Sequence, residues 1–339
     1  MTIILGIEST SHTFGVGIVK QEDDKIEFLS NQKDVFRPEK GKGIDPSLCS
    51  QHHRDVREKV LKKALEKACV SLEEVDVIAY SCGPGLPPCL LAGVELVQKI
   101  SLEYDILIVP VNHCIAHIEI AKFSGNLKDP MILYVSGGNT QIIGYFEGRY
   151  RVFGETMDIG IGNAFDVFAR EIDLEFPGGP KIDELSKTGS ERGNYIELPY
   201  VVKGMDLSFS GIVSDAVRRW NKSDKSHKFK EDLCFSFQET IFAMLTEVTE
   251  RALSHTKKNE LILTGGVAAS GRLQEMLSIM CKDRGVVFYA CPKEYAGDNG
   301  LMIAYAGLLQ FNSGQGVLEG KKADFNSNWR TDEVDVTWI

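Results

Sequence analysis

Two segments with the same plan constrain the fold of this chain more than any other feature. ILGIESTSHTFGVGIV (residues 4–19) and ILYVSGGNTQIIGYF (residues 132–146) each read as an apolar strand, a turn of small polar residues and a second strand. Each is explained separately by an ordinary hairpin. Together they predict two related lobes that face each other. Turns rich in Gly, Ser and Thr offer backbone N–H groups without bulky side chains, which suits a phosphate held between the lobes.

Two further junctions of small residues support this interpretation. ELILTGGVAASGRLQEML (residues 260–277) predicts a strand, a pair of glycines and a helix, whose N-terminus adds a partial positive charge. CGPGLPPCLLAGVELV (residues 82–97) predicts a similar junction, with Pro87 and Pro88 placed to begin a helix. A single strand–turn–helix junction is usually only a tight connection. Four such junctions in one chain favour a shared ligand site.

The rest of the chain alternates between apolar β-rich runs and segments of helical periodicity, which predicts an α/β architecture. The predicted strands are 2–7, 13–19, 75–81, 106–111, 130–135, 140–146, 259–264 and 286–290. The predicted helices are 53–69, 88–104, 114–123, 161–171, 210–220, 229–255, 268–283 and 295–311. Residues 33–46 and 221–228 predict exposed loops, and Ser71 with Glu74 predicts a turn.

Composition narrows the class of protein. The length of 339 residues favours two domains or two lobes. With 43% hydrophobic and 25% charged residues, the chain is typical of a soluble globular protein. It has no apolar run as long as a membrane span, and Met1–Gly6 runs directly into a strand-like segment, so no membrane association and no secretory signal are expected. Its eight cysteines contain no C-x-x-C pair. Scattered free thiols predict a reducing, cytoplasmic location.

The net charge of −10 argues against a protein that grips nucleic acid over its whole surface. Positive charge is nevertheless clustered in two stretches, at residues 52–67 and 218–230. Each stretch is explained by a solvated helix face. If the substrate is a nucleic acid, the two stretches predict local docking sites, with partner proteins supplying the rest of the surface.

A histidine pair lies in VPVNHCIAHIEIAKF (residues 109–123). His113 and His117 are four residues apart on a predicted helix, so their side chains share one face and can converge on a metal ion. The alternative is two half-buried histidines that pack beside the neighbouring isoleucines. The spacing alone leaves both interpretations open.

Six motifs, in this order, resemble one family: HCIAH (113–117), YVSGGNTQ (134–141), DIGIGNAFD (158–166), PGGPKID (177–183), LTGGVAAS (263–270) and AGDNG (296–300). The chain resembles the actin-like ATPase superfamily and, within it, the universal tRNA threonylcarbamoyladenosine synthesis family, the catalytic subunit of the KEOPS complex. The resemblance covers residues 3 to 312, and the ending RTDEVDVTW (330–338) is similar to the archaeal and eukaryotic branch. It implies a two-lobed α/β fold with a cleft between duplicated lobes. The first lobe would span 1–131, joined by 300–339, and the second 132–299.

The resemblance also implies a set of site residues. It assigns one metal ion per subunit to His113, His117, Tyr134 and Asp298, a mixed N/O set that suits iron first and zinc second. It assigns phosphate binding to Glu8, Ser9 and Thr10, where many superfamily members carry Asp in place of Glu8. It assigns binding of an adenine nucleotide or threonylcarbamoyl-adenylate to Tyr134, Val135, Ser136, Gly137, Gly138, Asp166, Gly179, Asp183 and Ser270. The family usually carries Asn at position 270, and serine reaches less far with one hydroxyl.

The implied activity is transfer of threonylcarbamoyl from its adenylate to the exocyclic amine of adenosine 37 in tRNAs that read codons beginning with adenine. No side chain is identified as the general base. The implied partners are tRNA, a kinase-like ATPase and small accessory subunits of a KEOPS-type complex. Three alternatives are a small-molecule kinase or ATPase of the superfamily, a non-catalytic nucleotide-gated scaffold, and a metalloprotease. The last is disfavoured because Cys114 stands where a zincin carries its general-base glutamate.

Overall fold

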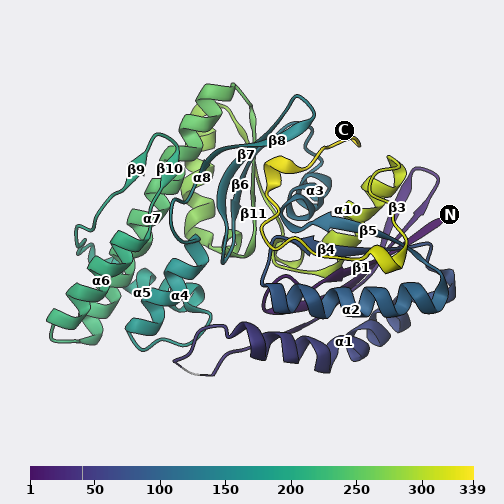
Figure 1. The fold of residues 1–339 in the computed structure, drawn as a ribbon. Coiled ribbons are helices and arrows are strands. Elements are labelled where there is room, and N and C mark those ends of the chain that lie inside the picture. The colour runs from purple at the N-terminus through teal and green to yellow at the C-terminus, as the bar shows by residue number, and fades with distance from the viewer. Residues whose placement is uncertain (40) are drawn as a thin grey trace.

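The computed structural model describes residues 1–39 and 41–339, and it contains two five-stranded sheets that lie side by side with helices around and between them (Figure 1). The first sheet has the order β3-β2-β1-β4-β5 and the second β12-β11-β6-β7-β8. The first comprises β1 (Thr2–Glu8), β2 (Thr13–Glu22), β3 (Lys25–Val35), β4 (Val77–Gly83) and β5 (Leu107–Asn112). The second comprises β6 (Met131–Val135), β7 (Thr140–Phe146), β8 (Arg149–Glu155), β11 (Glu260–Thr264) and β12 (Val287–Ala290). A separate ribbon pairs β9 (Val202–Lys203) with β10 (Asp206–Leu207).

The two sheets have the same strand directions. In the first, β1 pairs antiparallel with β2 and parallel with β4, while β2–β3 is antiparallel and β4–β5 parallel. In the second, β6 pairs antiparallel with β7 and parallel with β11, while β7–β8 is antiparallel and β11–β12 parallel. The hairpins β1–β2 and β6–β7 therefore occupy equivalent places. This confirms the predicted α/β fold with two related lobes.

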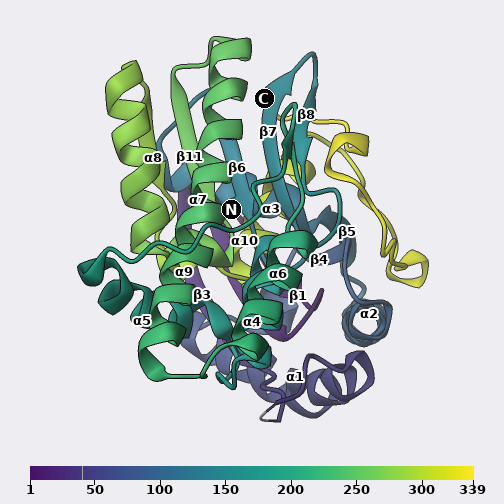
Figure 2. The ribbon, with the colours of Figure 1, turned by 90° about the vertical axis from the view of Figure 1, so that its left-hand side faces the viewer.

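The helices cover the sheets and fill the space between them. Figures 1 and 2 show α1 and α2 on an outer face of the first sheet, and α3 and α10 in the middle of the molecule. The helices are α1 (Pro46–Ala68), α2 (Pro87–Tyr104), α3 (His113–Gly125), α4 (Ile161–Glu171), α5 (Gly178–Arg192), α6 (Ser210–Lys222), α7 (His227–Thr256), α8 (Gly271–Arg284), α9 (Lys293–Ala296) and α10 (Gly300–Asn312). Short 3-10 turns lie at Leu72–Glu74, Gly266–Ala269, Gly320–Lys322 and Thr331–Glu333.

Helix α3 is buried over residues 113–121 because it packs against both lobes. Its Ile118 belongs to the core around the second sheet, whereas Ile120 belongs to the core that α10 shares with the first sheet. Helix α10 lies so close to the first hairpin that a Cβ on Gly17 would come within 2.2 Å of the Leu301 nitrogen. The glycine there is required by this close approach. The two helices thus fix the position of one lobe against the other.

The structure differs from the sequence-based expectation in several elements. Strands β3 and β8 and helix α5 were not predicted, and β3 includes the first part of the expected loop 33–46. Helix α1 begins at Pro46, with the Asp45 side chain as its N-terminal cap. The helical pattern 295–311 is interrupted between α9 and α10. Residue 40, inside the predicted loop 33–46, lies outside the described residues.

The chain after α10 packs against both lobes. Ala323 belongs to the core of the first sheet, whereas Val334 and Val336 belong to the core of the second. The division at residues 131 and 299 stays a prediction. Among the residues that the structure describes, none of the helices is both long and apolar enough to cross a membrane.

Candidate metal centre and nucleotide cleft

The four predicted small-residue junctions meet at one cleft of about 660 Å³. Thr10 to Thr13 of the first hairpin turn and Ser136 to Asn139 of the second line it from opposite lobes. The strand–helix junctions contribute Leu86 and Gly266. The convergence predicted from sequence is therefore present.

The second hairpin turn, Ser136–Asn139, presents bare backbone to the cleft. A Cβ on Gly138 would meet nothing within 4 Å, and one on Gly137 would meet only Asn163 Oδ1, at 3.7 Å. The N–H groups of these two glycines donate to none of the described residues. The turn is held from behind, because the N–H of Gly162 donates to the Ser136 carbonyl and that of Asn163 to the Gly137 carbonyl, each at 3.0 Å. With no partner among the described residues, the N–H groups of Gly137 and Gly138 can bind an anion.

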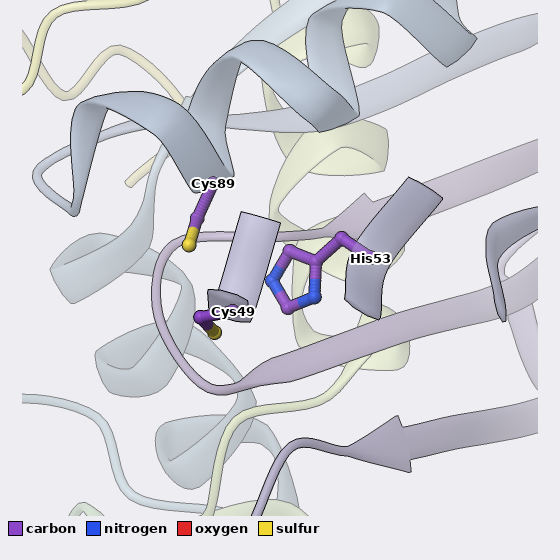
Figure 3. A group of neighbouring side chains, drawn as sticks. All are labelled: Cys49, His53 and Cys89. Carbon is purple, nitrogen blue, oxygen red and sulfur yellow. The ribbon is translucent and has the colours of Figure 1, made fainter. Parts of the chain in front are cut away.

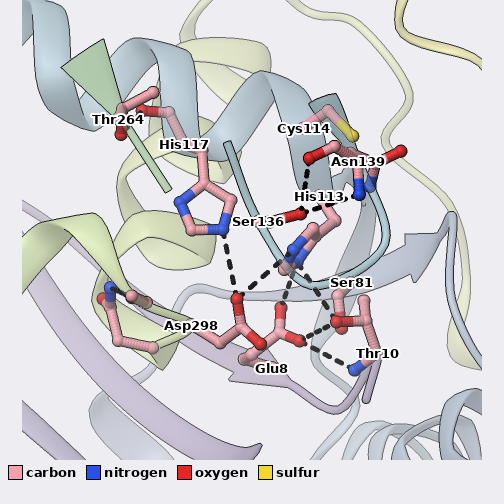
Figure 4. Close-up of polar contacts among 12 residues, drawn as sticks. Glu8, Thr10, Ser81, His113, Cys114, His117, Ser136, Asn139, Thr264 and Asp298 are labelled. Carbon is pink, nitrogen blue, oxygen red and sulfur yellow. Dashed lines mark hydrogen bonds and ion pairs between the residues drawn. The ribbon is translucent and has the colours of Figure 1, made fainter. Parts of the chain in front are cut away.

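The first hairpin turn is filled by its own side chains. Glu8 Oε1 accepts hydrogen bonds from the Thr10 N–H at 2.7 Å and the Thr10 hydroxyl at 2.5 Å, while the Ser9 N–H donates to Ser81 Oγ at 2.9 Å. Glu8 Oε2 is 3.0 Å from His113 Nδ1. Glu8, expected among the phosphate-binding residues, is fully buried and faces a histidine (Figure 4).

Helix α3 carries the two histidines toward that carboxylate. The helix begins at His113 because the Asn112 side chain accepts hydrogen bonds from the Cys114 and Ile115 N–H groups. His113 and His117 lie one turn apart, with ring centroids 4.7 Å from each other. The Nε2 atoms of His113 and His117 are 3.6 and 3.2 Å from Asp298 Oδ1 (Figure 4).

Asp298 reaches the histidines because the chain breaks its helical path between α9 and α10. Gly297–Asn299 forms the break, and Asn299 Oδ1 caps α10 by accepting from the Met302 N–H at 2.9 Å. The turn is also fixed by Lys33 Nζ, which donates to the Asp298 carbonyl at 3.0 Å. The two histidines and the aspartate place one ligand atom each within 4.8 Å of one another.

Tyr134 is a fully buried residue of β6 beside this group. Its ring packs against His117 at 5.1 Å between centroids. Its hydroxyl is buried and has no hydrogen-bond partner among the described residues, and the same holds for His117 Nδ1. A buried hydroxyl without a partner is costly. Two imidazoles, a carboxylate and this phenol fit a single transition-metal ion, and Glu8 on the far nitrogen of His113 is the outer support that such ligands usually have.

The pKa values in this group are shifted because its charged side chains are buried and lie close together. Burial lowers the pKa of His113, but the charge and hydrogen bond of Glu8 outweigh it and raise that pKa to about 9. Burial also opposes ionisation of Asp298, yet the hydrogen bond from His117 and the two imidazoles lower its pKa. Burial lowers the pKa of His117 and raises that of Tyr134 well above its usual value. The negative charges of Glu8 and Asp298 therefore favour positive charge among the imidazoles.

The other residues predicted to bind the nucleotide differ in whether they line the cleft. Asp166 lines the cleft, accepts a hydrogen bond from the Gly178 N–H at 2.7 Å, and has its pKa raised by burial. Gly179 faces open space, since a Cβ there would meet nothing within 4 Å. Asp183 accepts from Gln238 Nε2 at 3.0 Å and pairs with Lys187. The Ser270 hydroxyl is buried without a partner among the described residues. Of these four residues, Asp166 alone is among those that line the cleft.

Sequence reasoning missed several cationic or imidazole side chains of the cleft. Lys33 and Arg170 line it together with His12. Lys33 lies on the unpredicted strand β3, so no sequence signal pointed to it. Arg170 follows Asp166 by one helical turn on the predicted helix 161–171, and this spacing was a usable signal.

The chain was compared with known proteins. Residues 26–305 match the family model described as TsaD, tRNA N6-adenosine threonylcarbamoyltransferase. The Thermococcus sibiricus protein of that name is 53% identical, covering 99% of this chain and 100% of its own. The Methanococcoides burtonii protein of that name is 47% identical, covering 100% and 98%. A probable bifunctional tRNA threonylcarbamoyladenosine biosynthesis protein from Methanosarcina acetivorans is 48% identical over 100% of this chain and 60% of its own length.

A solved structure agrees with the fold. The crystal structure of HypF from T. kodakarensis matches with a TM-score of 0.61 and 13% identity, covering 91% of this chain and 47% of that one. At this identity the likeness concerns the fold alone, and it supports the predicted fold class. Because the family model spans most of the chain and the relatives are about half identical over all of it, this chain belongs to the tRNA N6-adenosine threonylcarbamoyltransferase family.

Proposed function

We infer that this chain transfers a threonylcarbamoyl group to the N6 amine of an adenosine in tRNA. The observation that carries the inference is that His113 and Asp298 line the same cleft as the open glycine turn, Ser136–Asn139. A donor bound through its phosphate at the turn would lie beside the candidate metal centre. The family membership of the whole chain supports the same reaction. The proposed donor is threonylcarbamoyl-adenylate, and the proposed acceptor is adenosine 37 of tRNAs that read codons beginning with adenine.

The backbone and charged side chains of the cleft bind the donor in this proposal. The free N–H groups of Gly137 and Gly138 hold the adenylate phosphate, whose charge is also offset by Lys33 and Arg170. Asp166 lines the same cleft and accepts from ribose hydroxyls. These contacts keep the phosphate in place as it becomes the leaving group.

The reaction is an acyl transfer. The N6 nitrogen attacks the carbamoyl carbon, a new C–N bond forms, and the bond from that carbon to the phosphate oxygen breaks, releasing AMP. One proton leaves the amine. A loop adenine can be splayed from its stack and reach such a cleft.

We propose that His113, His117, Tyr134 and Asp298 would hold one metal ion, iron in preference to zinc. When bound, such an ion supplies Lewis-acid stabilisation of the donor's developing negative charge. The protein's own contribution is geometric. Glu8 orients His113, Asn112 starts the helix that carries both histidines, and the turn before α10 brings Asp298 from the other side.

Partner proteins have a physical reason to take part. In the basic stretch of α1, Arg54 and Arg57 both pair with Glu95 of α2, so part of its charge is neutralised within this chain. We therefore propose weak, salt-dependent tRNA binding by the chain alone and tighter binding within a KEOPS-type complex with a kinase-like ATPase and small accessory subunits. The proposed location is the cytoplasm.

The alternatives fit the site less well. A small-molecule kinase would use the glycine turn but gives no role to the buried histidines, the aspartate and the phenol. A metalloprotease would need a general base beside the first histidine, where the chain has Cys114, a buried thiol whose pKa burial raises to about 11. A scaffold explains the cleft but gives no role to the Tyr134 hydroxyl, which has no hydrogen-bond partner among the described residues.

One experiment tests the proposal. The purified chain is mixed with synthetic threonylcarbamoyl-adenylate and tRNA, with and without the proposed partner subunits, and the digested nucleosides are identified by mass spectrometry. Threonylcarbamoyladenosine at position 37 supports the proposal. Product at another position, phosphorylation of a small molecule, or no threonine on the tRNA with all partners present would contradict it.

A further inference from the structure

A second cluster of potential ligands lies apart from the cleft, beneath the first hairpin turn. Cys49 and His53 are one turn apart on α1, and Cys89 lies in the first turn of α2 (Figure 3). One ligand atom from each lies within 4.8 Å of the others, and all three residues are fully buried. The cysteines contain no C-x-x-C pair, and local spacing could not reveal this cluster because its third residue comes from a different helix.

The imidazole of His53 is fully buried. Both Nδ1 and Nε2 are buried and without a partner among the described residues. The ring touches Phe14, with centroids 5.5 Å apart. A buried imidazole with two unsatisfied nitrogens is costly, whereas a metal bound to one of them removes part of that cost.

The two thiols lie close enough to His53 for all three residues to share one ion. Cys89 Sγ donates a weak hydrogen bond to the Pro46 carbonyl at 3.8 Å. Cys89 also lies at a helix N-terminus, where the helix dipole favours a thiolate. Cys49 Sγ donates to the Ser11 carbonyl at 3.2 Å, so an oxygen is at hand for a fourth ligand position.

We propose that Cys49, His53 and Cys89 form a second metal site, which takes Zn²⁺. Binding would convert both thiols to thiolates and release two protons, giving a neutral Cys2His centre. Thiolate ligands favour zinc over harder ions, which distinguishes this site from the N/O set of His113, His117, Tyr134 and Asp298. The ion would enter as the chain folds, since the cluster is enclosed.

The site would join three segments that shape the active cleft. Its ligands come from α1 and α2, and the Ser11 carbonyl belongs to the first hairpin turn. The same turn is tied to α2 by the Leu86 N–H, which donates to the Thr10 carbonyl at 2.8 Å. Zinc would therefore fix the turn whose Thr10 and Glu8 support His113, and its role would be to stabilise this corner of the first lobe.

A disulfide between Cys49 and Cys89 is the competing arrangement. It would leave both nitrogens of His53 unsatisfied and would need an oxidant. It also makes a different prediction, because oxidation removes two hydrogen atoms from the chain's mass and leaves no metal bound.

The test uses protein purified without chelators from medium supplemented with zinc or cobalt. Metal content is measured for wild type and for Asp298→Ala, which disables the first site. We expect Asp298→Ala to retain one zinc per chain, with sulfur neighbours at about 2.3 Å in X-ray absorption. We expect cobalt-grown wild type to show a thiolate-to-metal charge-transfer band, which the N/O site cannot produce.

Substitution of single cysteines shows which thiols give rise to the charge-transfer band. Cys49→Ser and Cys89→Ser should each remove it, whereas Cys234→Ser, a matched control at another buried cysteine on α7, should retain it. Wild type without sulfur scattering or the charge-transfer band would overturn the proposal, as would a band that survives in both site variants. A mass showing a disulfide, with no metal bound, would overturn it as well. The wild-type spectra decide even if a variant fails to fold.

Discussion

The two hairpin turns occupy equivalent places in the two sheets, yet they differ in what fills them. In the first turn, Glu8 and Thr10 are bonded to each other, and a Cβ on Gly85 would lie 2.6 Å from the Thr10 carbonyl oxygen. In the second turn, Gly137 and Gly138 have open space before them. The same backbone plan thus supports two different tasks. The first turn places side chains against the candidate metal centre, and the second offers backbone to a ligand.

The largest effect is expected from removing a ligand beside the first turn. His117→Ala and Asp298→Ala should each lose the metal and lower transferase activity by more than about 100-fold, since losing even an outer partner of a metal ligand costs 10–100-fold. Elemental analysis and the nucleoside assay measure the two losses, and circular dichroism confirms folding. If wild-type protein reproducibly contains no transition metal at this site, the proposal that the first turn supports a metal centre would be refuted.

The next effect separates the role of Glu8 from phosphate binding. Glu8→Ala should weaken metal affinity by about 10–100-fold, because His113 loses the carboxylate 3.0 Å from its Nδ1. Glu8→Gln keeps an acceptor and should lose less. Competition with a chelator gives the metal affinity, and titration with AMP gives the nucleotide affinity. A larger loss of AMP affinity than of metal affinity would assign Glu8 to the phosphate instead.

A matched pair of valine substitutions tests the turns directly. Gly85→Val should destabilise the fold by about 1–3 kcal/mol because the side chain would overlap the first turn. Gly137→Val should leave stability unchanged and weaken binding of a non-hydrolysable adenylate about tenfold or more, since its side chain would occupy space meant for the ligand. Thermal unfolding and calorimetric titration report the two quantities. Equal effects of both variants on stability would remove the distinction between the turns.

The sequence predicted most of the fold because buried strands and amphipathic helices leave strong periodic signals. Strand β3 was missed because it is an edge strand that buries only Ser30 and carries polar residues at most positions. Helix α5 was missed because it begins at two glycines and a proline and contains Gly189, which packs against α7. The start of α1 had a readable signal, Asp45 before Pro46, of the kind that marks helix N-termini.

The site was predicted less completely, because its parts come from distant segments. The spacing of His113 and His117 pointed to a shared face, but it could not show that Asp298 would lie beside them. The role of Glu8 toward His113 could not be predicted from a turn motif, since the two residues are 105 positions apart. Lys33 and the Cys49–His53–Cys89 cluster likewise depend on tertiary packing.

The smallest expected effect lies behind the second turn, at Asp158. Its carboxylate accepts from the N–H groups of Phe209 at 2.9 Å and Ser210 at 3.0 Å, at the start of α6. Burial opposes ionisation, but these bonds and one from the Ser208 hydroxyl lower the pKa of Asp158. A carboxyl pKa below the unfolded value of about 3.9 stabilises the fold above that pH, and the stabilisation disappears as pH falls through the folded pKa.

Asp158→Asn should therefore cost about 1 kcal/mol at pH 7, the usual worth of a helix cap. The difference from wild type should begin to shrink below the unfolded carboxyl pKa of about 3.9 and should disappear only as pH falls through the lower folded pKa. The cost should also fall at high salt, because the carboxylate is partly exposed. Urea unfolding of both proteins at pH 7 and at about pH 3 measures how the difference in their free energies of unfolding changes with pH. The lower pH is chosen because it lies below the unfolded carboxyl pKa of about 3.9. Adenylate affinity should remain unchanged, because Asp158 holds the segment behind the turn to α6 and leaves the Gly137 and Gly138 amides free. A loss of affinity that exceeds the loss of stability would place Asp158 in the ligand site and erase the contrast between a supported turn and a binding one.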